Sequence, residues 1–113
     1  MENCVFCKII NGQIPAEKVY EDDMVLAFKD IQPAAPIHIL IIPKQHVVNI
    51  MEATDADMMQ ALMEAVRKIA TQLGVDKSGF RLITNCGKDA GQEVMHLHFH
   101  LLAGKTLGEK IVG

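Results

Sequence analysis

The clearest pattern along the chain is an alternation of polar and apolar side chains between positions 95 and 102. Histidines occupy positions 96, 98 and 100, and leucine or phenylalanine occupies positions 97, 99 and 101. Successive side chains of a β-strand point to opposite faces, so this spacing places the three imidazoles in one row at intervals of roughly 6.6 Å. A helix would distribute them around its circumference. The pattern predicts a strand with one imidazole face and one apolar face.

Four other short apolar segments are typical of strands, at positions 19–20, 24–28, 37–42 and 80–84. The acidic positions 21–23 predict a hairpin turn between the first two. Positions 30–36 include two prolines and are expected to form a loop. Positions 37–42 are apolar on both faces apart from His38, which predicts a central strand that is covered on both sides.

Two helices are expected. Residues 4–10 form a short one that ends at Asn11 and Gly12. A longer helix starts after Thr54, its N-cap, and ends at Gly74. Its main apolar stripe predicts packing against the sheet. A second apolar row either belongs to a deeply buried helix or, in the interpretation that we prefer, packs against another subunit. This second row consists of Met59, Met63, Val66 and Ala70.

These elements favour an α+β fold with an antiparallel sheet, and residues 1–113 are expected to form one domain. The net charge of −3 offers no basic surface for nucleic acid. The longest aliphatic run, residues 39–42, is far too short to cross a membrane. Three cysteines, an odd number, in a chain without a visible secretory signal favour reduced thiols and a cytoplasmic location.

The histidine row is the main candidate for chemistry. A single histidine in a strand is usually a packing residue, but three in register would each need hydrogen-bond partners if buried. Their spacing along a strand favours separate roles over one shared metal. The preceding loop contains Gly91 and offers backbone N–H groups to an anion. A neutral imidazole could attack phosphorus while a protonated neighbour stabilises the charge. His38 is either an orienting partner or a satisfied core histidine.

A second candidate site combines the pair Cys4 and Cys7 with His46 and His96. Two thiolates and two imidazoles would make a tetrahedral Cys₂His₂ zinc site. The alternative is a pair of reduced thiols on a short helix. Cys86 has no evident partner.

Residues 96–102 resemble the signature of the histidine-triad (HIT) family, three alternating histidines among apolar residues. The similarity spans about residues 4–104 and is to the Hint branch of the family. It also covers residues 6–10, 14–15, 20–23, 27–31, 35–38 and 42–44, as well as Asn85 and residues 91–92. The resemblance implies a five-stranded antiparallel sheet with one long and one short helix, joined to the sheet of a second copy in a homodimer.

The resemblance also implies an activity, the hydrolysis of purine nucleoside phosphoramidates such as AMP or GMP linked through nitrogen to lysine or a simple amine. Acyl-adenylates are a related substrate class. His98 would be the nucleophile and would form a nucleotidyl-imidazole that water then cleaves. His100 would bind the phosphate or the leaving group, and His38 would support it through hydrogen bonds. His96 would be structural or a zinc ligand, and no cofactor would be needed for catalysis.

A nucleotide pocket is implied as well. A purine would lie among Val5, Phe6, Ile9, Phe28 and Ile31. The Asp30 carboxylate would accept hydrogen bonds from the ribose hydroxyls. The phosphate would be surrounded by Asn85, Gly91, Gln92, Glu93, Val94, His98 and His100.

Two departures from the family pattern concern the leaving group. Glu93 stands where some members have a serine, and an acid there repels a phosphate unless it turns away or is protonated. The tail, residues 105–113, is short and has no tryptophan. A nucleotide-binding regulatory module with incidental turnover is the alternative function. A metallohydrolase that uses the histidine row as ligands would need a larger barrel than this chain can build.

Overall fold

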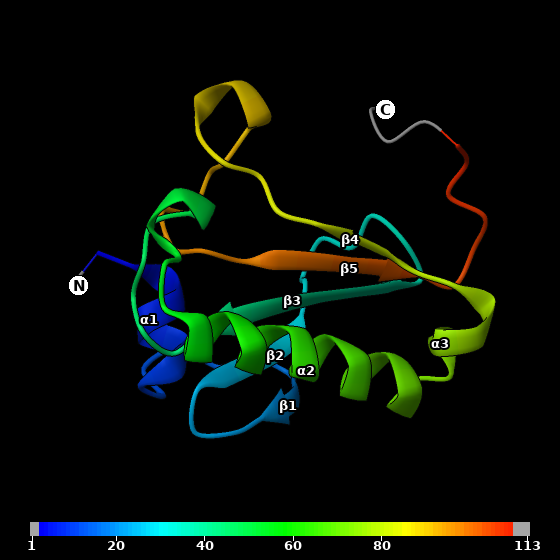
Figure 1. Cartoon of the computed structure of the whole chain (residues 1–113), viewed down its shortest axis with the longest axis horizontal. Helices are drawn as coiled ribbons and strands as arrows, with labels where there is room; N and C mark the ends of the chain where they lie inside the picture. The colour runs from blue at the N-terminus through cyan, green and yellow to red at the C-terminus, as the bar shows by residue number, and fades with distance from the viewer. Residues whose placement is uncertain (1–2, 110–113) are drawn as a thin grey trace.

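The computed structural model of the protein describes residues 3–109, and its centre is a five-stranded antiparallel sheet (Figure 1). The spatial order of the strands is β1-β2-β3-β5-β4. They are β1 (Lys18–Glu21), β2 (Val25–Lys29), β3 (Ile37–Pro43), β4 (Arg81–Ile83) and β5 (Phe99–Ala103). The predicted α+β class is confirmed, and β3 is the central strand as expected.

The sheet has a different helix on each face (Figure 1). The long helix α2 (Ala56–Gln72) packs on one face, and the short helix α1 (Val5–Ile10) packs on the other. Alternate residues of each strand serve the two faces. In β3, Ile39 and Ile41 pack toward α2, whereas Leu40 packs toward α1. Each fully buried aliphatic side chain stabilises this arrangement by roughly 1.5–3 kcal/mol.

The ends of α2 follow from local hydrogen bonding. Its N-cap is Asp55 and not Thr54, because Asp55 Oδ1 accepts hydrogen bonds from the backbone N–H groups of Asp57 at 3.0 Å and Met58 at 3.3 Å. Gly74 follows the helix with φ of 74°, a left-handed conformation that ends it as predicted. Within residues 3–109, no helix is both long and apolar enough to span a membrane.

The second apolar row of α2 is only partly available for contact with another subunit. Val66 and Ala70 belong to the core between α2 and the sheet, so the preferred interpretation of this row as a subunit interface is wrong for them. Met59 and Met63 are half-buried at the edge of the same core. A further helical turn, α3 (Val75–Ser78), was not predicted and buries Val75 against the same core.

The histidine strand starts later than its pattern indicates. β5 begins at Phe99, whereas His96 lies in a bend and His98 directly precedes the strand. β3 and β5 pair from Ile37–Ala103 to Ile41–Phe99. Continued along β3, this register would place Ile42 opposite His98 and Pro43 opposite Leu97, and Pro43 has no N–H to donate. The N–H of Leu97 instead donates to the Val47 carbonyl at 2.7 Å.

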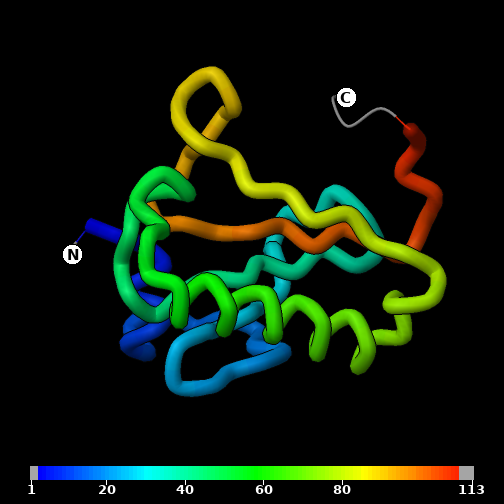
Figure 2. Tube along the Cα trace, viewed as in Figure 1, coloured from blue at the N-terminus to red at the C-terminus, as the bar shows by residue number. Residues whose placement is uncertain are grey.

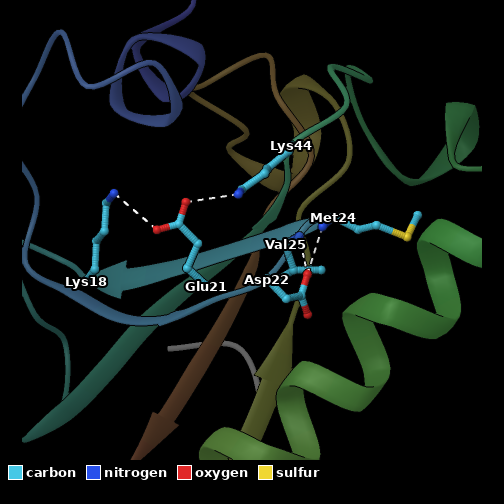
Figure 3. Close-up of polar contacts among 6 residues, drawn as sticks. All are labelled: Lys18, Glu21, Asp22, Met24, Val25 and Lys44. Carbon is cyan, nitrogen blue, oxygen red and sulfur yellow. Dashed lines mark hydrogen bonds and ion pairs between the residues drawn. The ribbon is translucent and has the colours of Figure 1, made fainter.

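The β1–β2 hairpin is held by its acidic turn (Figure 3). Asp22 Oδ1 accepts hydrogen bonds from the backbone N–H groups of Met24 and Val25, both at 2.8 Å. Tyr20 Oη–H donates to Asp22 Oδ2 at 2.7 Å. Burial opposes ionisation of Asp22, but these three hydrogen bonds outweigh it and hold the pKa of the carboxyl below its usual value. Glu21 joins the hairpin to the end of β3 through an ion pair with Lys44 at 2.9 Å.

Replacing Asp22 with alanine should weaken the fold, because two backbone donors and one hydroxyl lose their acceptor. We expect Asp22→Ala to lower the free energy of unfolding by about 1–2 kcal/mol, measured by urea denaturation. The exposed neighbour Asp23 is the matched control, and Asp23→Ala should change stability by less than about 0.5 kcal/mol. Equal effects of the two substitutions would show that the turn does not depend on Asp22.

Candidate active site

A cavity of about 560 Å³ opens on the α1 face of the sheet. Its walls come from α1, the segment after it, the end of β2, strand β3 and the segment between β4 and β5. Figure 2 shows that this last segment rises from the sheet as a loop. The lining residues are Val5, Phe6, Ile9, Ile14, Pro15, Ala16, Phe28, Lys29, Asp30, Ile31, Gln32, Leu40, Asn85, Gly91, Glu93, Val94, His98 and His100. It combines an apolar section with polar and imidazole groups, as small-molecule sites do.

His98 is held in one tautomer by its neighbours. Its Nδ1 lies 2.7 Å from the backbone carbonyl oxygen of His96, which can only accept, so Nδ1 carries the proton and donates. The Nε2 lone pair of the neutral ring is then free. Thr84 Oγ1 donates to the His98 carbonyl at 2.7 Å, and the Phe6 ring meets the His98 ring edge to face with centroids 5.1 Å apart. These contacts fix the ring of a residue that lines the cavity.

His38 and His100 form a hydrogen-bonded pair beside His98. The Ala34 N–H donates to His38 Nδ1 at 2.9 Å, so His38 carries its proton on Nε2. That Nε2–H donates to His100 Nδ1 at 2.9 Å, which leaves the His100 proton on Nε2. Asp30, His38 and His100 are close enough together to suggest a metal site, but a protonated Nε2 on His38 is a donor and not a ligand.

Both members of this pair are kept neutral. Burial, together with the neighbouring rings of His98 and His38 and against the attraction of the Asp30 carboxylate, lowers the pKa of His100 to about 4. Burial also lowers the pKa of His38, against the attraction of the Asp30 carboxylate. Asp30 Oδ2 lies 3.4 Å from His38 Nε2, and its Oδ1 accepts from the Gln32 N–H at 2.8 Å. The Asp30 carboxylate is therefore fixed where the apolar part of the cavity meets the histidines.

The loop before the histidines is held by a buried glutamine. Gln92 Nε2 donates to the carbonyls of Val48 at 2.7 Å and Val94 at 3.0 Å, and its Oε1 accepts from the Gly87 N–H at 2.9 Å. Gln92 was predicted to lie around a phosphate, but its side chain is used in holding the loop and does not line the cavity. Gly91, with φ of 78°, makes the turn that brings the loop back to the cavity.

His96 joins a different group of side chains. Its Nε2 lies 2.9 Å from the Pro43 carbonyl and must donate there, so its Nδ1 lone pair faces Cys4, Cys7 and His46. The Nδ1–Sγ distances from His96 are 3.3 Å to Cys4 and 3.6 Å to Cys7. His46 Nδ1 lies 3.4 Å from Cys7 Sγ and 3.2 Å from His96 Nδ1. All four donor atoms lie within 4.8 Å of one another.

These four residues fit zinc. Tetrahedral Zn–S and Zn–N bonds of about 2.3 and 2.0 Å place neighbouring donors roughly 3.3–3.8 Å apart, close to the spacing found here. Burial, helped by the adjacent Cys4 thiol, raises the pKa of Cys7 to about 11. Burial lowers the pKa of His96, which keeps the ring in the neutral form that binds metal. A divalent cation among the four donors would favour the thiolate form of Cys7, which burial and the neighbouring Cys4 thiol oppose.

The predicted row is thus divided between two places. His98 and His100 line the cavity with ring centroids 5.1 Å apart, while His96 is fully buried among the cysteines. Of the predicted purine contacts, Ile31 is at the rim of the cavity and 95% exposed, so it does not enclose a base in this structure. The remaining predicted purine residues line the cavity and are Val5, Phe6, Ile9 and Phe28.

Several residues of the site were not found from the sequence. Thr84, which positions His98, ends a predicted strand without a distinguishing pattern. Leu40 faces the cavity from the central strand, and only its period-2 relation to His38 could have indicated this. The other unpredicted lining residues are Ile14, Pro15, Ala16, Lys29 and Gln32.

The HIT domain family profile matches residues 11–107 of the chain. A fold with five antiparallel strands, together with alternating histidines that divide between a cavity and a buried cluster, agrees with that match. The chain belongs to the HIT family.

Individual relatives agree with this assignment. The purine nucleoside phosphoramidase of Escherichia coli (strain K12) is 46% identical over 109 residues, which cover 95% of this chain and 92% of the relative. A HIT family hydrolase from Clostridium thermocellum is 52% identical with a TM-score of 0.95, covering 99% of both chains. A histidine triad protein from Clostridium difficile is 51% identical with a TM-score of 0.93, covering 97% of both chains. These relatives support a hydrolase activity for this chain.

The low pKa of His100 predicts a pH dependence of stability. The pKa of an unfolded histidine is near 6.5, whereas the pKa of His100 in the folded protein is about 4. Between these pH values His100 is protonated in the unfolded chain but not in the folded chain, so a falling pH favours unfolding. The contribution of His100 is complete above pH 6.5 and is lost as the pH falls toward 4, by an amount on the order of 2–3 kcal/mol.

Denaturant unfolding at several pH values tests this. His100→Asn removes the titrating group, so its stability should fall less steeply than that of the wild type between pH 6.5 and 4. Above pH 7 the two curves should run parallel. Parallel curves over the whole range would contradict a buried neutral His100.

Proposed function

We propose that this protein hydrolyses purine nucleoside 5′-phosphoramidates and cleaves their P–N bond through a nucleotidyl intermediate on His98. The substrates are AMP or GMP linked to an amine, with acyl-adenylates as a related class. The single observation that carries the proposal is the hydrogen bond from His98 Nδ1–H to the His96 carbonyl, which leaves the Nε2 lone pair free in a cavity large enough for a nucleotide. Similarity to a purine nucleoside phosphoramidase supports the substrate class.

In the first step, the His98 Nε2 lone pair forms a bond to the α-phosphorus. The P–N bond breaks, its electron pair stays on the leaving nitrogen, and that nitrogen takes up one proton. His98 Nδ1 becomes the only protonated nitrogen of a ring that now carries positive charge, and its hydrogen bond to the His96 carbonyl strengthens. That bond stabilises the charge that develops in the transition state.

In the second step, a water oxygen displaces Nε2 from phosphorus and loses one proton, which releases the nucleoside monophosphate. Over both steps one water molecule is consumed, with its hydroxyl on phosphorus and one proton on the amine. His100 Nε2–H donates a hydrogen bond to a phosphoryl oxygen or to the leaving nitrogen. His38 keeps His100 in this tautomer by donating to its Nδ1 at 2.9 Å.

Nucleotide recognition is divided between the two ends of the cavity. Phe6, Ile9 and Phe28 provide the apolar surface for a purine, and the Phe6 and Phe28 rings meet edge to face with centroids 5.6 Å apart. Asp30 accepts hydrogen bonds from the ribose hydroxyls. Asn85 and Gly91 line the same cavity as His98 and His100, and the phosphate would bind among these four residues.

We further propose that Cys4, Cys7, His46 and His96 hold one structural zinc ion. The ion would tie the start of α1 to the segments after β3 and before β5, which lie far apart in the sequence. It is not required for the phosphorus chemistry, because none of its four donor atoms belongs to His98 or His100.

A homodimer is proposed for the assembled protein. Within residues 3–109, β4 pairs only with β5 and is an edge strand of the sheet. Phe80 beside it is 38% exposed. Exposed strand edges next to apolar side chains are suited to pairing with a second copy.

The covalent step predicts the effect of His98→Ala. This variant should hydrolyse an adenosine phosphoramidate at least about a thousandfold more slowly while it still binds AMP, because only the nucleophile is lost. Mass spectrometry of rapidly quenched wild-type enzyme should find one added AMP on the peptide that contains His98. A rate of hydrolysis by His98→Ala equal to that of the wild type would contradict the assignment of His98 as the nucleophile. Tight AMP binding by the wild type without any phosphoramidate hydrolysis would favour the regulatory alternative.

The zinc site has its own test. Metal analysis of protein purified without chelator should find one zinc per chain, and Cys4→Ser should lose it, since a hydroxyl is a poor substitute for a thiolate. Cys86→Ser is the matched control and should retain the metal. Zinc-free wild-type protein of undiminished thermal stability would show that the cysteines are bystanders.

A further inference from the structure

A second cavity adjoins the candidate active site. It has a volume of about 550 Å³ and lies on the far side of Val5, Glu93 and Val94, which line both cavities. Its remaining lining residues are Asn3, Cys4, His46, Val48 and Met95. A substrate that fills the first cavity with its nucleotide could therefore extend over this shared boundary into the second.

The second cavity has an apolar surface and one carboxylate. Val5, Val48, Val94 and Met95 supply aliphatic and thioether groups, and Met95 is 49% exposed. Glu93 is the only acidic side chain among its lining residues, and no lysine or arginine lines it. Zinc held by two thiolates and two neutral imidazoles would add no net charge. The cavity thus suits an apolar chain that ends in a cation.

The charges of the active-site cavity lead to the same conclusion. Its acidic residues are Asp30 and Glu93, and its only lysine, Lys29, is paired with Glu17 at 2.5 Å. Within residues 3–109, Glu93 takes part in no ion pair. A carboxylate that lines the same cavity as His98 repels an anionic phosphate. A positive charge on the substrate itself, placed next to Glu93, would remove this penalty.

We infer that the second cavity is the leaving-group subsite and that Glu93 selects phosphoramidates whose leaving amine carries a second, cationic group at the end of a short aliphatic chain. This inference rests on the proposed function and names the substrate class for the same site. The nitrogen on phosphorus lies by His98 and His100, the chain crosses the Val5–Val94 boundary, and the terminal ammonium pairs with Glu93. Simple diamines have this chemistry.

Two matched substrates test the inference. Both are adenosine 5′-phosphoramidates with a six-carbon leaving amine, one ending in an ammonium group (1,6-diaminohexane) and the other in a hydroxyl (6-hydroxyhexylamine). An exposed ion pair is worth up to about 1 kcal/mol, so the wild type should prefer the ammonium substrate by about three- to fivefold in kcat/KM. The preference should shrink as the salt concentration rises, because both charges are accessible to solvent.

Substitutions then assign the preference to one side chain. In Glu93→Gln the two substrates should be hydrolysed with nearly equal kcat/KM, and in Glu93→Lys the hydroxyl substrate should become the better one. Asp89→Asn is the matched control, because Asp89 is an exposed acid of the same loop that lines neither cavity. It should retain the wild-type preference.

The outcomes separate the two proposals. Hydrolysis of both substrates, with the same ratio in the wild type and in Glu93→Gln, would overturn the leaving-group subsite and leave the proposed function intact. An equal loss of preference in Asp89→Asn would also overturn it, because the effect would then come from net charge. Failure of the wild type to hydrolyse either substrate would overturn the proposed function itself.

Discussion

The candidate site depends on one hydrogen bond, which His98 Nδ1 donates to the backbone carbonyl of His96 at 2.7 Å. A neutral imidazole has one N–H and one lone pair, so this bond decides which nitrogen can act as a nucleophile. The surrounding structure holds both partners. Thr84 binds the His98 carbonyl, and the Leu97 N–H between the two histidines binds the Val47 carbonyl. On a mobile segment this hydrogen bond between neighbouring residues would not hold the imidazole in one orientation. The contacts with the sheet and with the loop keep it in place.

Pro43 explains why three evenly spaced histidines serve two purposes. The ladder between β3 and β5 stops at the pair Ile41–Phe99, and Pro43, which would face Leu97 in the same register, has no N–H with which to continue it. The Pro43 carbonyl then receives the N–H of His96 at 2.9 Å and turns that ring toward the cysteines. His100 stays in the ladder beside His38. The division of roles that the spacing suggested therefore has a backbone cause that lies in the central strand.

Much of the architecture could be predicted because strands and helices leave regular patterns of apolar positions in the sequence. Short apolar runs located four strands and alternation located the fifth, and the apolar positions 37–42 correctly indicated a central strand. The residues of the proposed zinc site could be named because few side chains bind zinc, although His96 lies 92 positions from Cys4. Loop geometry could not be predicted in this way. The buried role of Gln92, the exposure of Ile31 and the second cavity all depend on the paths of irregular segments, which carry no periodic pattern.

The tautomers of the histidines provide the most direct test of the central claim. They can be read from long-range ¹H–¹⁵N NMR spectra of the protein at pH 7.5, where each ring nitrogen reports whether it carries a proton. The account predicts a proton on Nδ1 and a bare Nε2 for His98, with the opposite arrangement, a proton on Nε2 and a bare Nδ1, for His100. A His98 ring that carries its proton on Nε2 would have its lone pair on Nδ1, against the His96 carbonyl oxygen, and would contradict the account.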